Sequence, residues 1–309
     1  MSLGDILGKA SKCSDAGLAS VGSYGCPFKF GLPDGIILVR KGYKVPAADD
    51  FNKEYLLDLI QTGVAIPLLN SFSFEPINED DVLETSVTGV NDLARKGLTS
   101  LMFTFKKGIE YEKALEKLTS FGAFDVWVVD KQGNFLGVDK GGDFAGWSAG
   151  LVLAKSKTWN TGSESEGKAI EVQLTQPGER KDTTWIEASA LDFFAPTEID
   201  GINGTYMDYS DMNGAVPPAG SDTDIKVQVL ANDKSTPILG LLEADFWVTI
   251  DGGAAPVTGV VEDGNGYYTL SVAVSAGEVV TKLYDTAKLV PAINVSDILF
   301  SGEVSAIAV

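Results

Sequence analysis

Between residues 84 and 138 the spacing of apolar residues changes from every second position to a helical period and back again. Leu101, Phe103 and Phe105 alternate with Met102 and Thr104, as in a half-buried β-strand. The next apolar residues, at positions 111, 114, 115, 118 and 121, form one helical stripe, and a glycine follows at 122 where a left-handed C-terminal cap is expected. The period of two returns at 126–129 and 135–138, on either side of a turn at 130–134. This stretch predicts one amphipathic helix packed on an antiparallel sheet.

The flanking segments predict more strands and one further helix. Residues 49–62 carry an apolar face and are followed by Gly63, which is typical of a short helix that ends there. Alternating apolar residues predict strands at 66–74, 147–154 and 170–174, and residues 183–190 are a further candidate. We therefore expect residues 49–197 to form a β-sandwich or barrel-like domain with one or two packed helices.

The character of the sequence changes after residue 197. Residues 198–221 are rich in Gly, Pro, Asn and Asp and are predicted to be a linker. Residues 222–309 contain short apolar runs, spaced at about 8–12 residues and separated by Gly-rich turns, without a helix of useful length. The runs are 225–230, 246–250, 257–261, 267–274, 279–284 and 304–309. We expect an immunoglobulin-like β-sandwich without the two-cysteine hallmark of antibody domains, and a chain that is mainly β as a whole.

Residues 1–48 are rich in Gly and Ser and show little periodicity. They nevertheless contain too many apolar side chains for a solvated tail, among them Leu18, Phe28 and the run 36–39. We interpret this segment as an N-terminal arm that lies on its own domain or on a neighbouring subunit. The alternative is a long irregular N-terminus that covers the sheet.

The absence of histidine from all 309 residues restricts the chemistry. It removes Ser-His-Asp and Cys-His nucleophile systems and the His-Glu-x-x-His zinc site, and two cysteines are too few soft ligands for structural zinc. We therefore expect no enzyme activity, no cofactor and no metal. The first residues include Asp5 and lack a basic segment before an apolar core, so we expect no secretory signal and synthesis in a cytoplasm. Cys13 and Cys26 are then expected to be reduced; a bridge that closes the short loop between them is the alternative.

The formal net charge of −19 argues against two classes of partner. Nucleic acid and anionic membranes both repel such a chain, and no apolar run approaches the roughly 20 residues that span a bilayer. The acidic run at 79–81 lacks the spacing of a Ca²⁺ loop, so we predict an exposed loop. Asp130 and Asp139 flank a hairpin turn, and we interpret them as turn residues and not as the carboxylate pair of a glycosidase.

Residues 66–195 carry short motifs that resemble the structural proteins of tailed bacteriophages. The motifs are the acidic run 79–81, Glu84-Thr85-Ser86 with Gly89, Arg95-Lys96-Gly97-Leu98, Phe103-Thr104-Phe105, the predicted helix at 111–121, residues 125–130 with Gly133-Asn134, and Gln173-Leu174-Thr175. Within that group, the order strand, hairpin, helix, strand, strand is similar to that of major tail tube proteins. These motifs cover less than half of the chain.

The resemblance implies a virion protein of the phage tail, whose β-sandwich subunits form hexameric rings that stack into a conduit. It implies contacts with other copies and with other virion proteins, and passage of double-stranded DNA without specific binding, because acidic walls do not hold the phosphate backbone. The C-terminal immunoglobulin-like domain would lie outside the tube. Two alternatives remain: a capsid decoration or auxiliary head protein, and a glycan-binding or glycan-degrading protein with an immunoglobulin-like module.

We place the candidate subunit interface on three segments: residues 66–74, the hairpin loop 84–97 and the N-terminal arm. Each has apolar or edge-strand character without an obvious partner elsewhere in the chain. The candidate interface residues are Ile66, Leu68, Phe72, Phe74, Glu84, Val87, Leu93, Arg95, Leu18 and Phe28.

Overall fold

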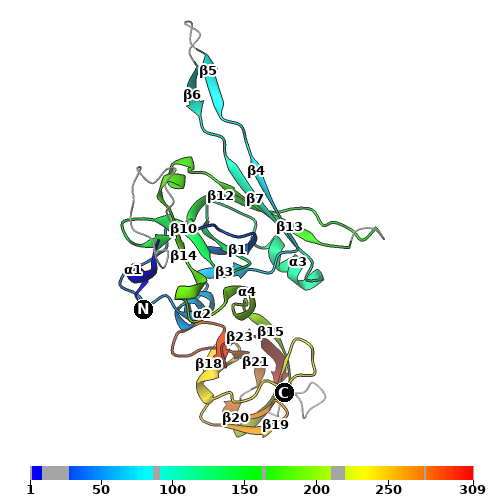
Figure 1. Cartoon of the computed structure of the whole chain (residues 1–309). Helices are drawn as coiled ribbons and strands as arrows, with labels where there is room; N and C mark the ends of the chain where they lie inside the picture. Colours follow the sequence, from blue (N-terminus) through cyan, green and yellow to red (C-terminus); the bar gives the residue numbers. More distant parts are fainter. Residues whose placement is uncertain are drawn as a thin grey trace. The chain divides into compact units, whose positions relative to one another are not determined.

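The computed structural model describes residues 2–8, 28–85, 91–161, 165–209, 220–274 and 276–308. These residues form a mainly β structure with a few short helices, as the sequence predicts. The chain divides into two compact units, which Figure 1 shows with their helices and strands labelled. Unit 1 comprises residues 1–56 and 64–199, and unit 2 comprises residues 57–63 and 200–309.

Unit 1 is built on an extensive antiparallel sheet whose main strand order is β2-β11-β10-β9-β12-β13-β7-β4. Its helices are α1 (Leu3–Ile6), the first residues of α2 (Lys53–Gln61), α3 (Ile109–Glu116), α4 (Ala195–Glu198) and the 3₁₀ turns Pro177–Asp182 and Ala188–Ala190. Its strands are β1 (Pro33–Arg40), β2 (Lys44–Val45), β3 (Ala65–Leu68), β4 (Ser73–Asn78), β5 (Val82–Thr85), β6 (Asn91–Arg95), β7 (Thr99–Phe105), β8 (Ser120–Phe121), β9 (Phe124–Asp130), β10 (Phe135–Asp139), β11 (Phe144–Ala145), β12 (Trp147–Ala154), β13 (Lys168–Leu174) and β14 (Thr183–Ile186).

Strand β12 joins the two halves of this sheet. Its first residues pair with β9 and its later residues pair with β13, with a register shift between Ala149 and Leu151. The two halves bury one core between them, to which β1 and β9 contribute from one side, β7 and β13 from the other, and α3 contributes Leu115. The architecture of unit 1 is therefore sandwich-like, with one strand passing from layer to layer.

The half of the sheet that contains β1 and β9 is covered on both faces. Consecutive residues of both strands are buried, a pattern that differs from the alternation of a one-sided strand. On the second face, Phe51 packs edge-on against Phe135 at 5.4 Å, and Trp127 stacks on Phe144 at 5.4 Å between ring centroids. Each such buried aromatic side chain contributes about 1.5–3 kcal/mol through the area it removes from water.

The N-terminal segment differs from the arm expected at residues 1–48. Strand β1 lies inside the sheet, between β3 and β9, and α1 places Leu3 in the core. A side chain at Gly35 would lie 2.1 Å from the carbonyl oxygen of Leu68, so close strand packing requires glycine there. Residues 33–40 are thus part of the body of unit 1. Leu18 and both cysteines lie outside the described residues.

The helices follow the predictions in part. Helix α2 lies within the predicted 49–62, and Gly63 follows it with φ +70°. Helix α3 is shorter than predicted: it ends at Glu116, and the predicted stripe residue Phe121 belongs to β8 with 83% of its surface exposed. Gly122 has the expected positive φ, +65°, but it follows this strand and not a helix. Three residues of the predicted stripe, Tyr111, Leu115 and Leu118, pack in or against the core. The prediction was wrong at Phe121, because residues 120–121 pair with β12 and do not continue the helix.

The single strand predicted at 66–74 is two strands. Strand β3 pairs with β1, whereas β4 begins at Ser73 and pairs with β7. Between them Asn70 adopts a positive φ of 59°, and its backbone N–H donates to the buried Asp34 carboxylate at 2.8 Å. This turn redirects the chain from one layer to the other.

Unit 2 is a β-sandwich with the strand order of immunoglobulin-like domains. One sheet has the order β19-β20-β16-β15-β23-β22, and the other has the order β18-β17-β21-β24. Apart from the β22–β23 hairpin, the two sheets have the strand orders D-E-B-A and C′-C-F-G, in the letters used for the strands of immunoglobulin domains. The strands are β15 (Asn203–Asp208), β16 (Gly220–Ala231), β17 (Phe246–Ile250), β18 (Gly253–Ala255), β19 (Val260–Gly264), β20 (Tyr267–Val274), β21 (Gly277–Leu283), β22 (Ile293–Val295), β23 (Ile298–Ser301) and β24 (Glu303–Ala308), and the 3₁₀ turn Glu243–Asp245 precedes β17.

The predicted linker at 198–221 contains part of this sandwich. Strand β15 pairs with β16 and, in parallel, with β23. Directly after it, Tyr209 is buried and its hydroxyl donates to Thr281 Oγ1 at 3.1 Å. The polar composition hid this strand, because its outer face is largely solvent-exposed.

Candidate interaction surfaces

The most prominent feature of unit 1 is a long β-hairpin, which we call the arm (residues 73–85 and 91–105). Strands β4 and β7 form its base, with Phe74 opposite Phe103 and Asn78 opposite Thr99. Strands β5 and β6 continue it, with Leu83 opposite Leu93. Figure 1 shows the arm leaving the rest of unit 1, and among the described residues β5 and β6 pair only with each other.

A junction at residues 79–81 and 96–98 connects the base of the arm to its outer part. Gly97 donates its backbone N–H to Asp81 Oδ1 at 2.7 Å, and Glu79 donates its own to the Leu98 carbonyl at 2.9 Å. A side chain at position 97 would lie 1.9 Å from the Glu79 carbonyl oxygen, so the two strands approach here as only glycine allows. Arg95 pairs with Glu79 at 3.3 Å on the surface, a contact of small energetic value.

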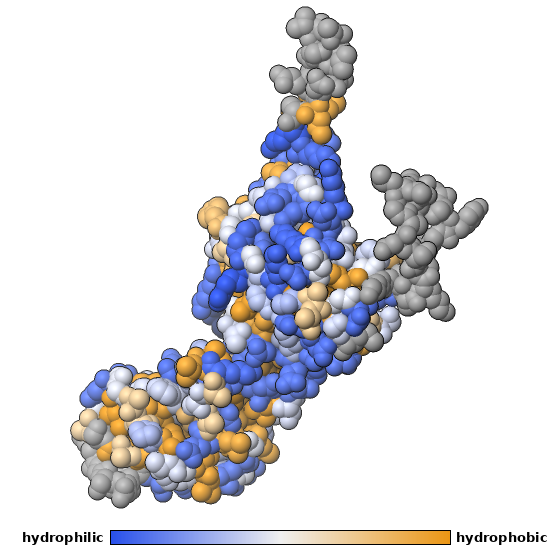
Figure 2. Space-filling view, turned by 90° about the vertical axis from the view of Figure 1, so that its left-hand side faces the viewer, coloured by the Kyte–Doolittle hydropathy of each residue, from blue (hydrophilic) through white to orange (hydrophobic). Residues whose placement is uncertain are grey.

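The outer arm exposes apolar side chains next to carboxylates. Leu83 and Leu93 are 57% and 50% exposed, and Val82 is exposed beside them. Residues 73–105 contain six acidic and two basic residues. Figure 2 shows the resulting surface, hydrophilic along most of the arm with a hydrophobic patch near its end. Exposed apolar residues on a projecting strand pair do not stabilise the fold, so this patch has the character of a contact surface.

The base of the arm adds a second exposed aromatic group. Phe72, directly before β4, is 64% exposed, and the Lys106 ammonium lies 3.4 Å from its ring centroid. Strand β4 is the last strand of the sheet order and pairs only with β7 among the described residues. The free edge of β4 is therefore a candidate for pairing with another chain, and the exposed Phe72 directly precedes it.

The candidate residues from the sequence fall into three groups. Phe72, Leu93 and Arg95 are exposed on or beside the arm. Leu68 is 4% exposed, Ile66 and Phe74 pack against the core, and Phe28 stacks on Trp185 at 4.8 Å, so these four serve internal packing. Glu84 lies in β5, but its side chain, together with all of Val87 and Leu18, is outside what the structure describes.

Sequence reasoning missed Ile77, Val82 and Leu83. All three are exposed on the arm. They flank the acidic run 79–81, which we had predicted to be a simple exposed loop. Val82 and Leu83 directly follow three carboxylates, which is unusual for a solvated loop. This apolar pair was the sequence feature that could have predicted an exposed apolar patch here.

Asp130 and Asp139 are structural residues, as predicted. The Asp130 carboxylate is fully buried and accepts hydrogen bonds from the backbone N–H groups of Gly31, Gln132 and Asn134 at 2.7–2.9 Å, and from Asn134 Nδ2 at 2.8 Å. Asp139 accepts one bond from the Gly142 N–H at 2.7 Å. Asp130 therefore has no free lone pair of the kind that catalysis on a substrate needs.

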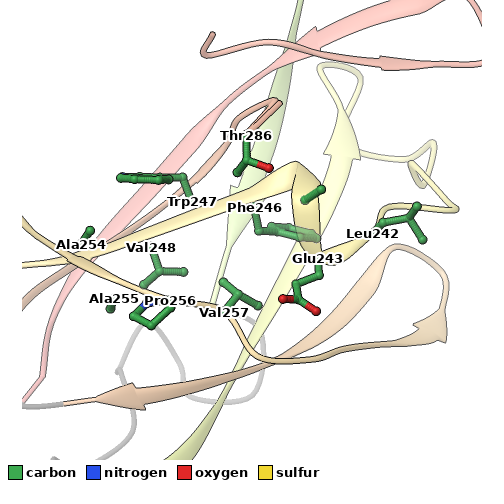
Figure 3. A pocket seen from close by; sticks show the side chains of 11 residues that line it. Leu242, Glu243, Phe246, Trp247, Val248, Ala254, Ala255, Pro256, Val257 and Thr286 are labelled. Atoms are coloured by element: carbon green, nitrogen blue, oxygen red, sulfur yellow. The ribbon is translucent and has the colours of Figure 1, made fainter. Parts of the chain in front are cut away.

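Unit 2 contains a pocket with a volume of about 620 Å³. It lies beside β17, where β18 stops opposite Val248 and leaves Phe246 and Trp247 without a strand on that side. Figure 3 shows its lining, in which Leu242, Phe246, Pro256 and Val257 supply apolar surface and Glu243 a carboxylate. This volume falls in the usual range for small-molecule sites.

One carboxylate, that of Glu243, lines this pocket, and that of Asp245 directly precedes β17. Burial, with a further contribution from the Asp285 charge, raises the pKa of Asp245, whose carboxylate accepts the Leu242 N–H at 2.8 Å. The exposed Glu243 has neither an ion pair nor a hydrogen bond from its side chain to any described residue. Trp247 packs on Tyr284 at 5.3 Å between centroids, over which Lys282 lies at 5.8 Å. A ligand with an apolar body and hydrogen-bond donors fits this combination.

Among the residues that the structure describes, no three or more Asp, Glu, Cys or His side chains converge as a metal site would require. No described helix has the length and apolar character to cross a membrane. Comparisons with protein-family models, with curated proteins and with solved structures find no match.

Proposed function

We propose that this chain is a non-enzymatic structural subunit that assembles with copies of itself, and specifically a tail tube subunit of a tailed-phage virion. The observation that carries the assembly proposal is the arm. Its strands are ordered by backbone pairing, it contributes Leu83 and Leu93 to no core, and it ends in an apolar patch. An exposed apolar patch on an ordered projection is typical of a surface that contacts another protein.

The acidity of the chain is compatible with a conduit for DNA. Lys and Arg side chains bind DNA by displacing condensed counterions, and a wall dominated by Asp and Glu does not hold the phosphate backbone. The net charge of −19 therefore suits a tube whose content must slide through. In this proposal the immunoglobulin-like unit 2 lies outside the tube, where other virion proteins or host surfaces meet it.

Electron microscopy of the purified full-length chain at high concentration, with a light-scattering mass, tests the proposal. Six-fold rings or tubes are the expected result. A trimer, or a monomer that binds capsids, would instead support a decoration protein of the head. A monodisperse monomer that binds neither itself nor a virion part would refute a structural role.

A paired variant tests whether the arm makes the contact. Leu83→Ser with Leu93→Ser removes the cross-strand apolar pair at the end of the arm and is expected to abolish assembly. Ile109→Ser is the matched control, because Ile109 is 56% exposed in the same unit but lies at the start of α3. Equal assembly by both variants would remove the arm from the interface.

Ligand binding by unit 2 is a second candidate function, favoured by the pocket beside Trp247. A sugar ring stacks well on indole and donates hydroxyl groups to a carboxylate such as Glu243. A glycan array probed with the full chain and with Trp247→Ala tests this, with Phe121→Ala as the control for an exposed aromatic residue elsewhere. Binding that survives Trp247→Ala, or no binding to any glycan, rejects the pocket as a glycan site.

A further inference from the structure

A second projection of unit 1 carries an exposed tryptophan. Beyond the ends of β12 and β13, residues 155–161 and 165–167 continue the hairpin, and Thr158 and Gly167 exchange two backbone hydrogen bonds of 2.9 and 3.1 Å. Trp159 follows directly and is 72% exposed. A tryptophan exposed on a projection neither stabilises the core nor improves solubility, and tryptophan is enriched among the residues that dominate protein interfaces.

This tryptophan stands on a fixed support. Lys157 forms ion pairs with Glu112 of α3 at 2.9 Å and with Glu166 across the hairpin at 3.0 Å. The Lys157 ammonium also lies 5.3 Å from the Trp159 ring centroid. Lys155 pairs with Glu171 at the base of the same projection. A side chain whose backbone is already ordered loses little conformational entropy on binding, which is the property of an interface anchor.

The other end of the same hairpin carries a hollow of about 230 Å³. Trp147 at the start of β12, Leu174 at the end of β13, Leu101 of β7 and Pro177 form its apolar lining. This volume equals that of about eight water molecules and is on the scale of one large side chain. The hollow is therefore large enough to hold one aromatic side chain.

The rim of the hollow matches an indole in chemistry as well. Arg180 is held over the rim by its bonds to the Gly97 carbonyl, at 3.2 Å, and to Thr99, and Glu179 is held by the Ser148 N–H at 2.8 Å. The exposed Gln176 side chain has no hydrogen-bond partner among the residues that the structure describes. An inserted tryptophan would stack on Trp147 or Arg180 and donate its N–H to the Gln176 amide oxygen.

We infer that Trp159 of one chain inserts into this hollow of a second copy. Within one chain the two features lie at opposite ends of β12 and β13. The eight residues of β12 span about 25 Å and Trp159 lies beyond its end, so Trp159 does not reach its own hollow. A projection at one end and a hollow at the other define a head-to-tail contact, which closes into a ring or continues as a filament. This inference rests on the proposed self-assembly and names a contact other than the arm.

Two variants of the full-length chain, each lacking one half of the contact, test the inference. Trp159→Ala removes the projection, and Gln176→Arg places a long cation across the hollow; both positions are exposed, so folding is preserved and is checked by circular dichroism. Phe121→Ala is the matched control, since Phe121 is a more exposed aromatic residue of the same unit. Sedimentation equilibrium gives the association constant of each protein.

Each of the two variants is expected to weaken association at least about thirty-fold, the effect of losing a hot-spot residue, and Phe121→Ala is expected to match the unmodified chain. A mixture of Trp159→Ala and Gln176→Arg chains is expected to associate more strongly than either variant alone, because one intact projection then meets one intact hollow. A mixture that stays monomeric, or unchanged association of Trp159→Ala, overturns the inference.

The outcomes separate this contact from the arm. If the arm variants abolish assembly and the Trp159 variant does not, the proposed function stands and the inference fails. If the arm variants assemble normally and the Trp159 variant does not, the inference stands without the arm. A chain that remains monomeric at every concentration refutes both.

Discussion

Replacement of the buried carboxylate of Asp130 should be among the most destabilising single changes in unit 1. In Asp130→Ala, four donors lose their acceptor: the N–H groups of Gly31, Gln132 and Asn134 and the Asn134 side-chain amide. Water can reach the Gln132 N–H, whose residue is exposed, and the half-buried Gly31, but Asn134 is only 7% exposed. The backbone N–H and the side-chain amide of Asn134 would then be buried donors without their carboxylate acceptor, each costing about 1–3 kcal/mol. With the loosening of the β9–β10 turn, the free energy of unfolding is expected to fall by about 3–5 kcal/mol.

Urea unfolding in a Trp247→Phe background measures this loss, because all remaining tryptophans then lie in unit 1. With a slope of about 2–3 kcal/mol per molar, the midpoint should fall by roughly 1–2 M. Asp139→Ala is the control, since its exposed carboxylate accepts one hydrogen bond, and it should cost less than about 1 kcal/mol. A loss for Asp130→Ala no greater than that of Asp139→Ala would refute the assignment of Asp130 as the organiser of this turn.

Three further predictions concern the arm, the net charge and unit 2. Gly97→Ala forces a side chain against the Glu79 carbonyl and should reduce assembly, as measured by light scattering. Its urea midpoint should fall by less than that of Asp130→Ala, and normal assembly would contradict the prediction. Because like charges repel across any contact between copies of a −19 chain, association should strengthen from about 0.01 to 0.5 M salt, and weakening with salt would show that ion pairs dominate. Burial raises the pKa of Tyr268 from 10.0 to about 12, so its contribution to stability is complete below pH 10 and is lost as the pH rises through 12; alkaline unfolding of Tyr268→Phe should lack this step.

The elements that sequence predicted best are those whose periodicity is local. Strand β7, the pair β9 and β10 and helix α2 each show their period within the segment itself, and the immunoglobulin-like unit follows from evenly spaced short runs. Strand β1 was missed because both of its faces are buried. Its continuous apolar run, 36–39, has no alternation, and its neighbours β3 and β9 are distant in sequence.

The candidate surfaces were harder to predict for the same reason. Whether Phe72 or Leu68 is exposed depends on the turn at Asn70, whose positive φ and bond to Asp34 separate β3 from β4. An alternating pattern gives the spacing of side chains but not which face meets the core. Trp159 was visible as one tryptophan among five, but its exposure and its counterpart at the far end of β12 and β13 exist only in three dimensions.

Pairing along the arm explains how an exposed apolar surface can persist on a monomer. An isolated two-stranded hairpin is marginally stable in water, so β5 and β6 alone would gain little from pairing. Here β4 and β7 are already part of the large sheet. Because they are paired in a fixed register, β5 and β6 are held next to each other beyond the Gly97 junction. The entropy of closing the hairpin is thus offset by the folding of unit 1, and a second copy that covers Leu83 and Leu93 meets a surface that is already ordered. In the proposed assembly, repulsion between the six carboxylates of each arm would oppose this contact at low salt, and the apolar area that it buries would determine its strength.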